Sequence, residues 1–222
     1  MLATTQYTIS NELLQEAVHS LPEIGSRLAL NEPSGSFFTE HWNIKPEFKG
    51  TVWEQILDSL DEPKGEARLI KMGPGECYPS HADIDDRWHL TITGNHSFLI
   101  DLDTNIMYST DPNGQWYLMD AGKRHSAANF GSENRIQLVV RKLLPSGMIN
   151  NPVDITIRLK VVNYDYRFVF DDIVSPWLND AFKRGIVNHF EMDTHTVKIT
   201  ISKEYINNLK ETIKEHFTID EY

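Results

Sequence analysis

The sequence contains a single cysteine, Cys77, among its 222 residues. One cysteine excludes an intrachain disulfide framework and a cysteine-based zinc site, and it fits a reducing compartment. No apolar run approaches the roughly 18 residues that a membrane-spanning helix requires. Residues 1–10 also lack the basic and apolar regions of a secretory signal peptide. We therefore expect a cytoplasmic protein with no membrane partner.

Positive charge is scarce as well. The chain has 21 lysines and arginines against 32 acidic residues, which gives a formal net charge of −11 at pH 7. An acidic protein repels phosphate backbones, so we expect no nucleic-acid partner. Internal repeats and low-complexity tracts are absent too. The length allows one catalytic domain with a smaller unit beside it.

Two short amphipathic helices are predicted near the N-terminus. The first covers residues 10–21, because Ser10 can cap it, apolar residues recur at helical spacing, and Pro22 stops it. The second covers about residues 52–60, with its apolar side chains on one face. Residues 31–50 contain several prolines and glycines and are predicted to be loop.

The hydrophobic period changes after residue 66. Alternating apolar and polar residues predict strands over 67–72, 87–93, 96–101, 105–109, 115–119 and 135–143. Turn sequences such as Asp111-Pro112-Asn113-Gly114 separate them. Many short strands with Gly and Pro turns are typical of a jelly roll. We predict a mainly β fold, with a double-stranded β-helix core and N-terminal helices within residues 1–148.

A different pattern follows the prolines and glycine of residues 145–152. Residues 149–222 are predicted to form a small α+β extension of β-α-β-α order, over 153–163, 170–184, 196–202 and 203–217. Three roles remain open for the extension: it covers the mouth of the barrel, binds a partner, or forms a dimer. The sequence does not fix the oligomeric state.

His81 and Asp83 form a His-x-Asp pair, and residues i and i+2 of a strand point to the same side. Two histidines and one carboxylate are the ligand set of non-haem iron(II) oxygenases, which leave the remaining metal positions open. His125 can supply the second histidine, and Arg135 follows ten residues later. An arginine at that spacing can enter the same cavity and hold a carboxylate with two hydrogen bonds.

A second His-x-acid pair, His189 and Glu191, lacks this context. The histidines that follow it, His195 and His216, have no arginine ten residues later. We interpret His189 and Glu191 as structural or surface residues.

The arrangement of His81, Asp83, His125 and Arg135 resembles the signature of Fe(II)- and 2-oxoglutarate-dependent oxygenases. More narrowly, residues 67–142 resemble the aspartyl/asparaginyl β-hydroxylase family, which is related to cupins. The matching stretches are Met72-Gly73-Pro74-Gly75, Arg87-Trp88-His89-Leu90, Asp120 with His125, and Arg135. The resemblance covers about a third of the chain.

The resemblance implies Fe(II), 2-oxoglutarate and O2 as cofactors and co-substrates, with succinate and CO2 as products. It assigns His81, Asp83 and His125 to the metal, Arg87 and His89 to the C1 end of 2-oxoglutarate, and Arg135 to its C5 carboxylate. The implied substrate is a small molecule or a peptide, hydroxylated on an amino acid or on an Asp, Asn or Pro side chain.

Several alternatives remain open from the residues alone. Arg141 shares a strand face with Arg135 and is a second candidate for the 2-oxoglutarate anchor. Arg87 is either a site residue or a surface charge beside Asp85, and His89 is either a ligand contact or a core histidine. The competing function is a cupin-like metal-binding protein without oxygenase activity, such as a sensor or an isomerase.

Overall fold

The computed structural model describes residues 1–34, 42–83, 85–143, 149, 151–160, 170–192 and 195–221, without the side chains of residues 189–192. The N-terminal part contains strands β1 (Leu2–Thr8), β2 (Arg27–Ala29), β3 (Asn31–Pro33), β4 (Trp42–Ile44), β5 (Lys64–Met72), β6 (Arg87–Thr93), β7 (Ser97–Asp101), β8 (Ile106–Ser109), β9 (Gln115–Met119), β10 (His125–Asn129) and β11 (Arg135–Lys142). Its helices are α1 (Asn11–His19), the 3-10 turn η1 (Pro46–Phe48) and α2 (Val52–Asp58).

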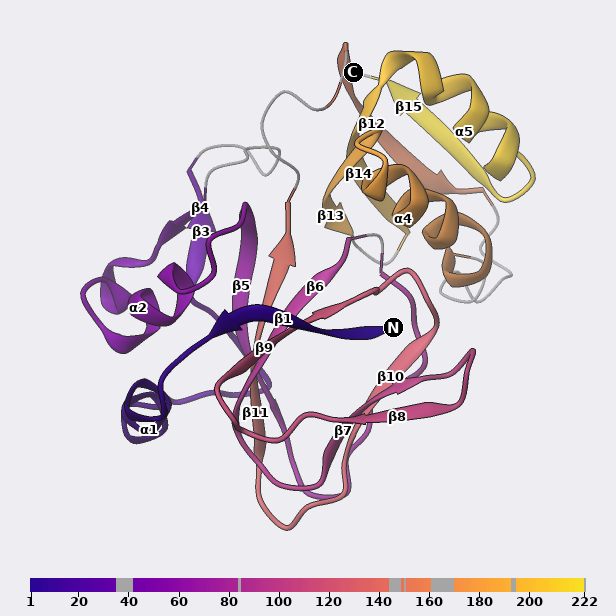
Figure 1. Ribbon diagram of the computed structural model, residues 1–222. Coiled ribbons are helices and arrows are strands. Elements are labelled where there is room, and N and C mark those ends of the chain that lie inside the picture. Colours follow the sequence, from indigo (N-terminus) through magenta and orange to yellow (C-terminus); the bar gives the residue numbers. More distant parts are fainter. Residues whose placement is uncertain are drawn as a thin grey trace.

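Two facing sheets form the core of this part (Figure 1). A six-stranded sheet has the order β1-β9-β6-β11-β5-β2, and a three-stranded sheet has the order β10-β7-β8. Every pairing within them is antiparallel. This arrangement confirms the predicted jelly-roll core.

The large sheet separates an apolar layer from a polar cavity. On β11, Ile136, Leu138 and Val140 face a hydrophobic cluster that includes α1 and α2, and Arg135 stands on the opposite face. Full burial of side chains such as Leu138 contributes about 1.5–3 kcal/mol each. The apolar layer therefore fixes the strand register, and the register places the polar side chains in the cavity.

Local capping explains where the helices begin. The Ser10 hydroxyl accepts a hydrogen bond from the Leu13 amide at 3.2 Å, and the Thr51 hydroxyl accepts one from Trp53 at 3.2 Å. Both helices were predicted within one or two residues of their observed starts. The loop prediction for residues 31–50 was wrong in part, because β3 and β4 form a hairpin there and η1 follows. Residues 35–41 lie outside the described residues.

The C-terminal part has its own hydrophobic cluster. It comprises β12 (Pro152–Leu159), the π-helical turn η2 (Phe170–Val174), α4 (Ser175–Lys183), β13 (Val187–Met192), β14 (Thr196–Ser202), the 3-10 turn η3 (Lys203–Tyr205), α5 (Ile206–Ile213) and β15 (Phe217–Glu221). The sheet order is β13-β14-β12-β15, all antiparallel. The helices cover one face of this sheet (Figure 1).

The predicted β-α-β-α order of the extension was incomplete. The structure adds β13 between α4 and β14, and Phe217 begins β15 instead of ending the last helix. Phe217 remains buried, because the apolar residue that suited the helix face also fits the strand. Predicted strand residues 161–163 lie outside the described residues. No helix in the described ranges is long and apolar enough to cross a bilayer.

Candidate metal centre and anion-binding cavity

The segment before Asp83 runs antiparallel to β10 and carries the first histidine. His81 and His125 exchange backbone hydrogen bonds of 3.0 and 2.8 Å. Cys77 forms a second antiparallel β-bridge, with Ala128. The two imidazole rings are therefore neighbours, with centroids 4.3 Å apart. The sequence-based picture of His81 and Asp83 on one strand was wrong, because His81 forms an isolated bridge and Asp83 lies in the following loop.

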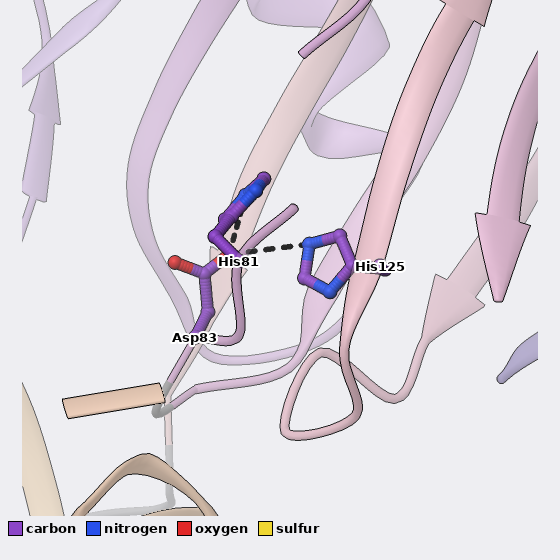
Figure 2. A group of neighbouring side chains, drawn as sticks. All are labelled: His81, Asp83 and His125. Carbon is purple, nitrogen blue, oxygen red and sulfur yellow. Dashed lines mark ion pairs between the residues drawn. The ribbon is translucent and has the colours of Figure 1, made fainter. Parts of the chain in front are cut away.

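Asp83 completes a compact group of three possible metal ligands. Its Oδ2 atom lies 3.9 Å from His81 Nε2 and 3.8 Å from His125 Nε2. Figure 2 shows the three side chains converging, with dashed lines between the carboxylate and both rings. One ligand atom from each residue lies within 4.8 Å of the others. A hydrogen bond from the Asp83 amide to Ala121 O at 2.8 Å holds this loop in place.

Hydrogen bonds set the tautomer of both histidines. His81 Nδ1 lies 2.9 Å from Pro79 O, and His125 Nδ1 lies 2.8 Å from Lys123 O. A carbonyl oxygen only accepts hydrogen bonds, so each Nδ1 carries the proton. The Nε2 atom of each ring is then the one available to a metal, and a hydrogen bond from Nδ1 to a carbonyl oxygen is typical of metal-binding histidines.

The charge state of the group also suits a cation. Burial alone would raise the pKa of Asp83, but the positive charge of the neighbouring Arg87 opposes it, and the pKa of this carboxyl lies well below its usual range. Burial lowers the pKa of His125, so its ring is neutral at pH 7. A carboxylate and neutral imidazoles are the forms that coordinate divalent metals.

Arg87 and Arg141 both form ion pairs with one buried carboxylate, that of Asp85. Arg87 Nη2 lies 2.8 Å from Asp85 Oδ1 and 3.2 Å from Asp83 Oδ1. Arg141 Nε lies 2.5 Å from Asp85 Oδ2, and Asp85 is completely buried. Arg87 is thus not a surface charge. Its Nε and Nη1 atoms are buried without a hydrogen-bond partner among the described residues.

Arg135 lies in a different environment. It is 1% exposed and makes no ion pair with a described carboxylate; its Nη2 donates to Gln137 Oε1 at 2.5 Å. Its Nε atom is buried without a partner in the described part of the chain. Burial lowers the pKa of Arg135 to about 10, so it stays protonated at neutral pH. Gly94 allows its approach, because a Cβ there would lie 2.9 Å from Arg135 Cα.

Gln137 connects Arg135 to His89. The oxygen Oε1 must face the guanidinium, which only donates, and the same oxygen lies 2.9 Å from His89 Nδ1. His89 Nδ1 is therefore the protonated nitrogen. Burial lowers the pKa of His89 to about 3, so the ring is neutral and its Nε2 is an acceptor, buried with no partner among the described residues.

One cavity of about 480 Å³ connects these groups. It is lined by all six residues expected at the site, namely His81, Asp83, Arg87, His89, His125 and Arg135, and also by Arg141. The second His-x-acid pair, His189 and Glu191, belongs to β13 of the C-terminal sheet, where its side chains are outside the described part.

Sequence reasoning missed further cavity residues, among them Arg27, Arg68, Tyr78 and Gln137. Gln137 shares the strand face of Arg135, so alternation alone could have found it. Arg27 stands on a three-residue strand without a pattern of its own, and its position depends on pairing with β5.

The C-terminal part packs against the loops that carry the metal group. Arg124, next to His125, forms an ion pair with Asp172 at 2.7 Å. Asn179 Nδ2 donates to Asp86 Oδ1 at 3.2 Å, and Lys183 lies 2.7 Å from Asp120. The C-terminal part therefore contacts both loops that lead to the metal ligands.

Solved structures and curated proteins were compared with this chain. Among solved structures, a cupin domain from Bordetella pertussis Tohama I matches at 15% identity, 38% coverage of this chain, 88% of that chain and a TM-score of 0.33. A Pseudomonas putida prolyl-4-hydroxylase matches at 11% identity, with 64% and 91% coverage and a TM-score of 0.41. A comparison with curated proteins gave no match.

The sequence model of the aspartyl/asparaginyl β-hydroxylase family matches residues 32–145, slightly more than half of the 222 residues. This span includes the metal group, the cavity strands β5, β6 and β11, and Arg135. The chain belongs to the aspartyl/asparaginyl β-hydroxylase family.

Proposed function

We propose that the protein is a non-haem Fe(II)- and 2-oxoglutarate-dependent dioxygenase that hydroxylates an amino acid or a peptidyl side chain of the Asp, Asn or Pro type. The observation that carries the proposal is Arg135, a buried guanidinium without a carboxylate partner among the described residues, in the same cavity as the metal group. A buried charge is costly unless it is paired, so this site favours an anionic ligand.

The metal group fits iron(II). His81 and His125 offer Nε2, and Asp83 offers an ionised carboxylate, which together make the facial set of two histidines and one carboxylate. When bound, Fe(II) and 2-oxoglutarate would supply O2-dependent oxidation that puts one oxygen atom into succinate, releases CO2 and puts the other oxygen atom into a substrate C–H bond.

The protein residues hold and orient the co-substrate. Arg135 would form two parallel hydrogen bonds with the C5 carboxylate of 2-oxoglutarate. Arg141 is the weaker candidate, because Asp85 already neutralises it at 2.5 Å. At the other end, the unpartnered Nε and Nη1 atoms of Arg87 suit the C1 carboxylate.

His89 has a separate role in this proposal. Its Nε2 accepts a hydrogen bond, so direct contact with a carboxylate would require the ring to take up a proton. Burial opposes that protonation. We therefore assign His89 to the C1 end as an acceptor for a hydroxyl group or a water molecule, with Arg87 carrying the charge.

Iron-dependent turnover of 2-oxoglutarate tests the proposal. Metal-stripped protein receives Fe(II), ascorbate and 2-oxoglutarate, and succinate is measured with and without amino acids and peptides. His81→Ala and Arg135→Met are expected to abolish succinate formation, while Arg158→Met, a surface arginine of the C-terminal sheet, retains it. Absence of succinate in the unmodified protein, with no thermal stabilisation by 2-oxoglutarate and Mn(II), favours a metal-binding cupin-like protein instead.

A further inference from the structure

Asp171 of the C-terminal part is a buried carboxyl group to which the proposed function assigns no role. Its side chain belongs to a residue that is 3% exposed, and its Oδ2 atom has no hydrogen-bond partner among the described residues. Burial raises the pKa of this carboxyl to about 6, so the group is ionised at neutral pH although its surroundings disfavour the charge. Buried acidic groups of this kind often lie at functional sites.

The place of Asp171 in the fold is the segment that carries two of the three candidate ligands. The backbone amide of Ala82 donates a hydrogen bond to the Asp171 carboxyl group. His81 and Asp83, on either side of Ala82, interact with the same carboxyl group electrostatically. Ala82 itself is 2% exposed. Asp171 therefore reaches the backbone between two metal ligands from a different part of the chain.

The backbone of this segment needs an acceptor at Ala82. The amides of His81 and Asp83 donate to carbonyl oxygens of β10 and of the loop after β9, at 3.0 and 2.8 Å. The Ala82 amide lies between them, and no carbonyl oxygen of the described residues accepts from it. Buried amides are almost always paired. Asp171 thus supplies the acceptor that a neighbouring strand would supply in a continuous sheet.

The next residue, Asp172, contacts the segment of the third ligand. Its Oδ1 atom lies 2.7 Å from Nη1 of Arg124, the residue before His125. The Nε atom of Arg124 also donates to the hydroxyl group of Ser80, the residue before His81, at 3.3 Å. Two consecutive carboxylates therefore contact both of the segments that carry the metal ligands.

The π-helical turn η2 holds these two carboxylates in place. Phe170 and Val174, at its two ends, are buried in the hydrophobic cluster of the C-terminal part. The turn is thereby anchored on one side, and it presents Asp171 and Asp172 to the ligand segments on the other. Turns of this type are rare, and they occur frequently at functional sites.

We propose that Asp171 is a positioning residue of the metal centre, which holds the Ala82 amide and thereby directs the side chains of His81 and Asp83 toward the metal. The inference rests on the metal site of the proposed function. It gives the C-terminal part a role in that site, because η2 completes the hydrogen bonding of the ligand segment, with Asp172 acting in the same way near His125. Loss of an outer partner of metal ligands typically changes metal affinity about 10–100-fold.

Metal binding by two variants of similar shape tests the proposal. Asp171→Leu removes the acceptor and is expected to weaken Mn(II) binding about tenfold or more in calorimetric titration. Asp171→Asn keeps an oxygen acceptor for the amide and is expected to recover most of the affinity. Asp180→Asn is the matched control, because Asp180 is an exposed residue of α4 whose carboxylate pairs with Arg184. It should leave Mn(II) binding unchanged.

A spectroscopic measurement separates positioning from a general loss of structure. The visible absorption of Co(II)-loaded protein depends on the coordination geometry. We expect an altered spectrum for Asp171→Leu and the unmodified spectrum for Asp180→Asn. Thermal unfolding of the metal-free protein checks that each variant is folded. If Asp171→Leu does not fold, Asp171→Ala removes the same acceptor without adding apolar atoms and takes its place.

Three results overturn the inference: an unchanged Mn(II) affinity in the folded variant without an acceptor, an unchanged Co(II) spectrum in that variant, or an Asn variant that binds Mn(II) no better. Failure of the proposed function is recognised separately, because the unmodified protein would then bind no 2-oxoglutarate in the presence of Mn(II).

Discussion

Arg141 donates from Nε to Oδ2 of Asp85 at 2.5 Å, and both side chains are almost fully buried. The other oxygen of Asp85 lies 2.8 Å from Arg87. One carboxylate therefore compensates two guanidinium groups and joins the cavity faces of β6 and β11. Arg87 and Arg141 are thus paired with a carboxylate, whereas the described partner of Arg135 is the neutral amide of Gln137.

Asp85→Asn is expected to destabilise the fold strongly. It would leave Arg87 and Arg141 buried with too little negative charge, and removal of one partner from a buried ion pair costs about 3–5 kcal/mol. Urea unfolding measures the loss. Asp220→Asn is the control, because its ion pair with Arg158 is about half exposed, at 49% for Asp220, and we expect a change within about 0.5 kcal/mol. Equal effects of the two substitutions would contradict this account of Asp85.

Gln137→Glu is expected to weaken binding of 2-oxoglutarate without loss of the metal. The new carboxylate would stand where the amide now accepts from Arg135, and it would neutralise the guanidinium. We expect about tenfold weaker 2-oxoglutarate binding or more, with Mn(II) affinity little changed. Calorimetric titration of each ligand measures both, and Gln55→Glu on the exposed face of α2 serves as the control. Unchanged 2-oxoglutarate affinity would show that Arg135 is not its anchor.

Gly122→Ala tests the packing of the C-terminal part on the metal loops. A Cβ at Gly122 would lie 2.2 Å from Cγ of Asn179, so the side chain or α4 must move. Overpacking of this kind costs about 1–3 kcal/mol, and thermal unfolding detects it. Gly25→Ala is the matched control, since nothing lies within 4 Å of its added Cβ. Identical melting temperatures for the two variants would mean that Asn179 does not pack closely there.

The raised pKa of Asp171 predicts that the stability of the fold depends on pH. Burial raises the pKa of this carboxyl to about 6, above the ordinary value of 3.8. Because the folded state holds the proton more tightly than the unfolded chain, stability from this group falls as the pH rises from about 4 to about 6. In metal-free protein, Asp171→Asn should remove up to about 3 kcal/mol of this loss above pH 7. Chemical unfolding at pH 4.5 and 7.5 checks it; an Asn variant with no advantage at the higher pH would refute the prediction.

Strand positions in the core were predictable because turn residues bound them and one face is apolar. Residues 87–93, 115–119 and 196–202 were predicted with the same bounds as β6, β9 and β14. Strand β1 was missed, because four of its seven residues are polar and it obtains its partner from β9, more than 100 residues away. Strand β2 is too short for a hydrophobic pattern.

The candidate site was predictable for the residues whose spacing along the chain forms a recognisable motif. His81, Asp83, His125 and Arg135 follow from the motif, and the structure brings them to one cavity. The pairing of Arg27 with Ile70, the sharing of Asp85 by two arginines and the contact of Asn179 with Asp86 depend on register between distant segments. Single-sequence periodicity contains no information on that register.

The central claim is that Arg135 and the metal group together bind 2-oxoglutarate, and calorimetric titration of 2-oxoglutarate into Mn(II)-loaded protein tests it most directly. The account predicts saturable binding that disappears without Mn(II), weakens about tenfold or more in Arg135→Met, and persists in Arg158→Met. Binding that is indifferent to Mn(II), or equally strong in Arg135→Met, would contradict it.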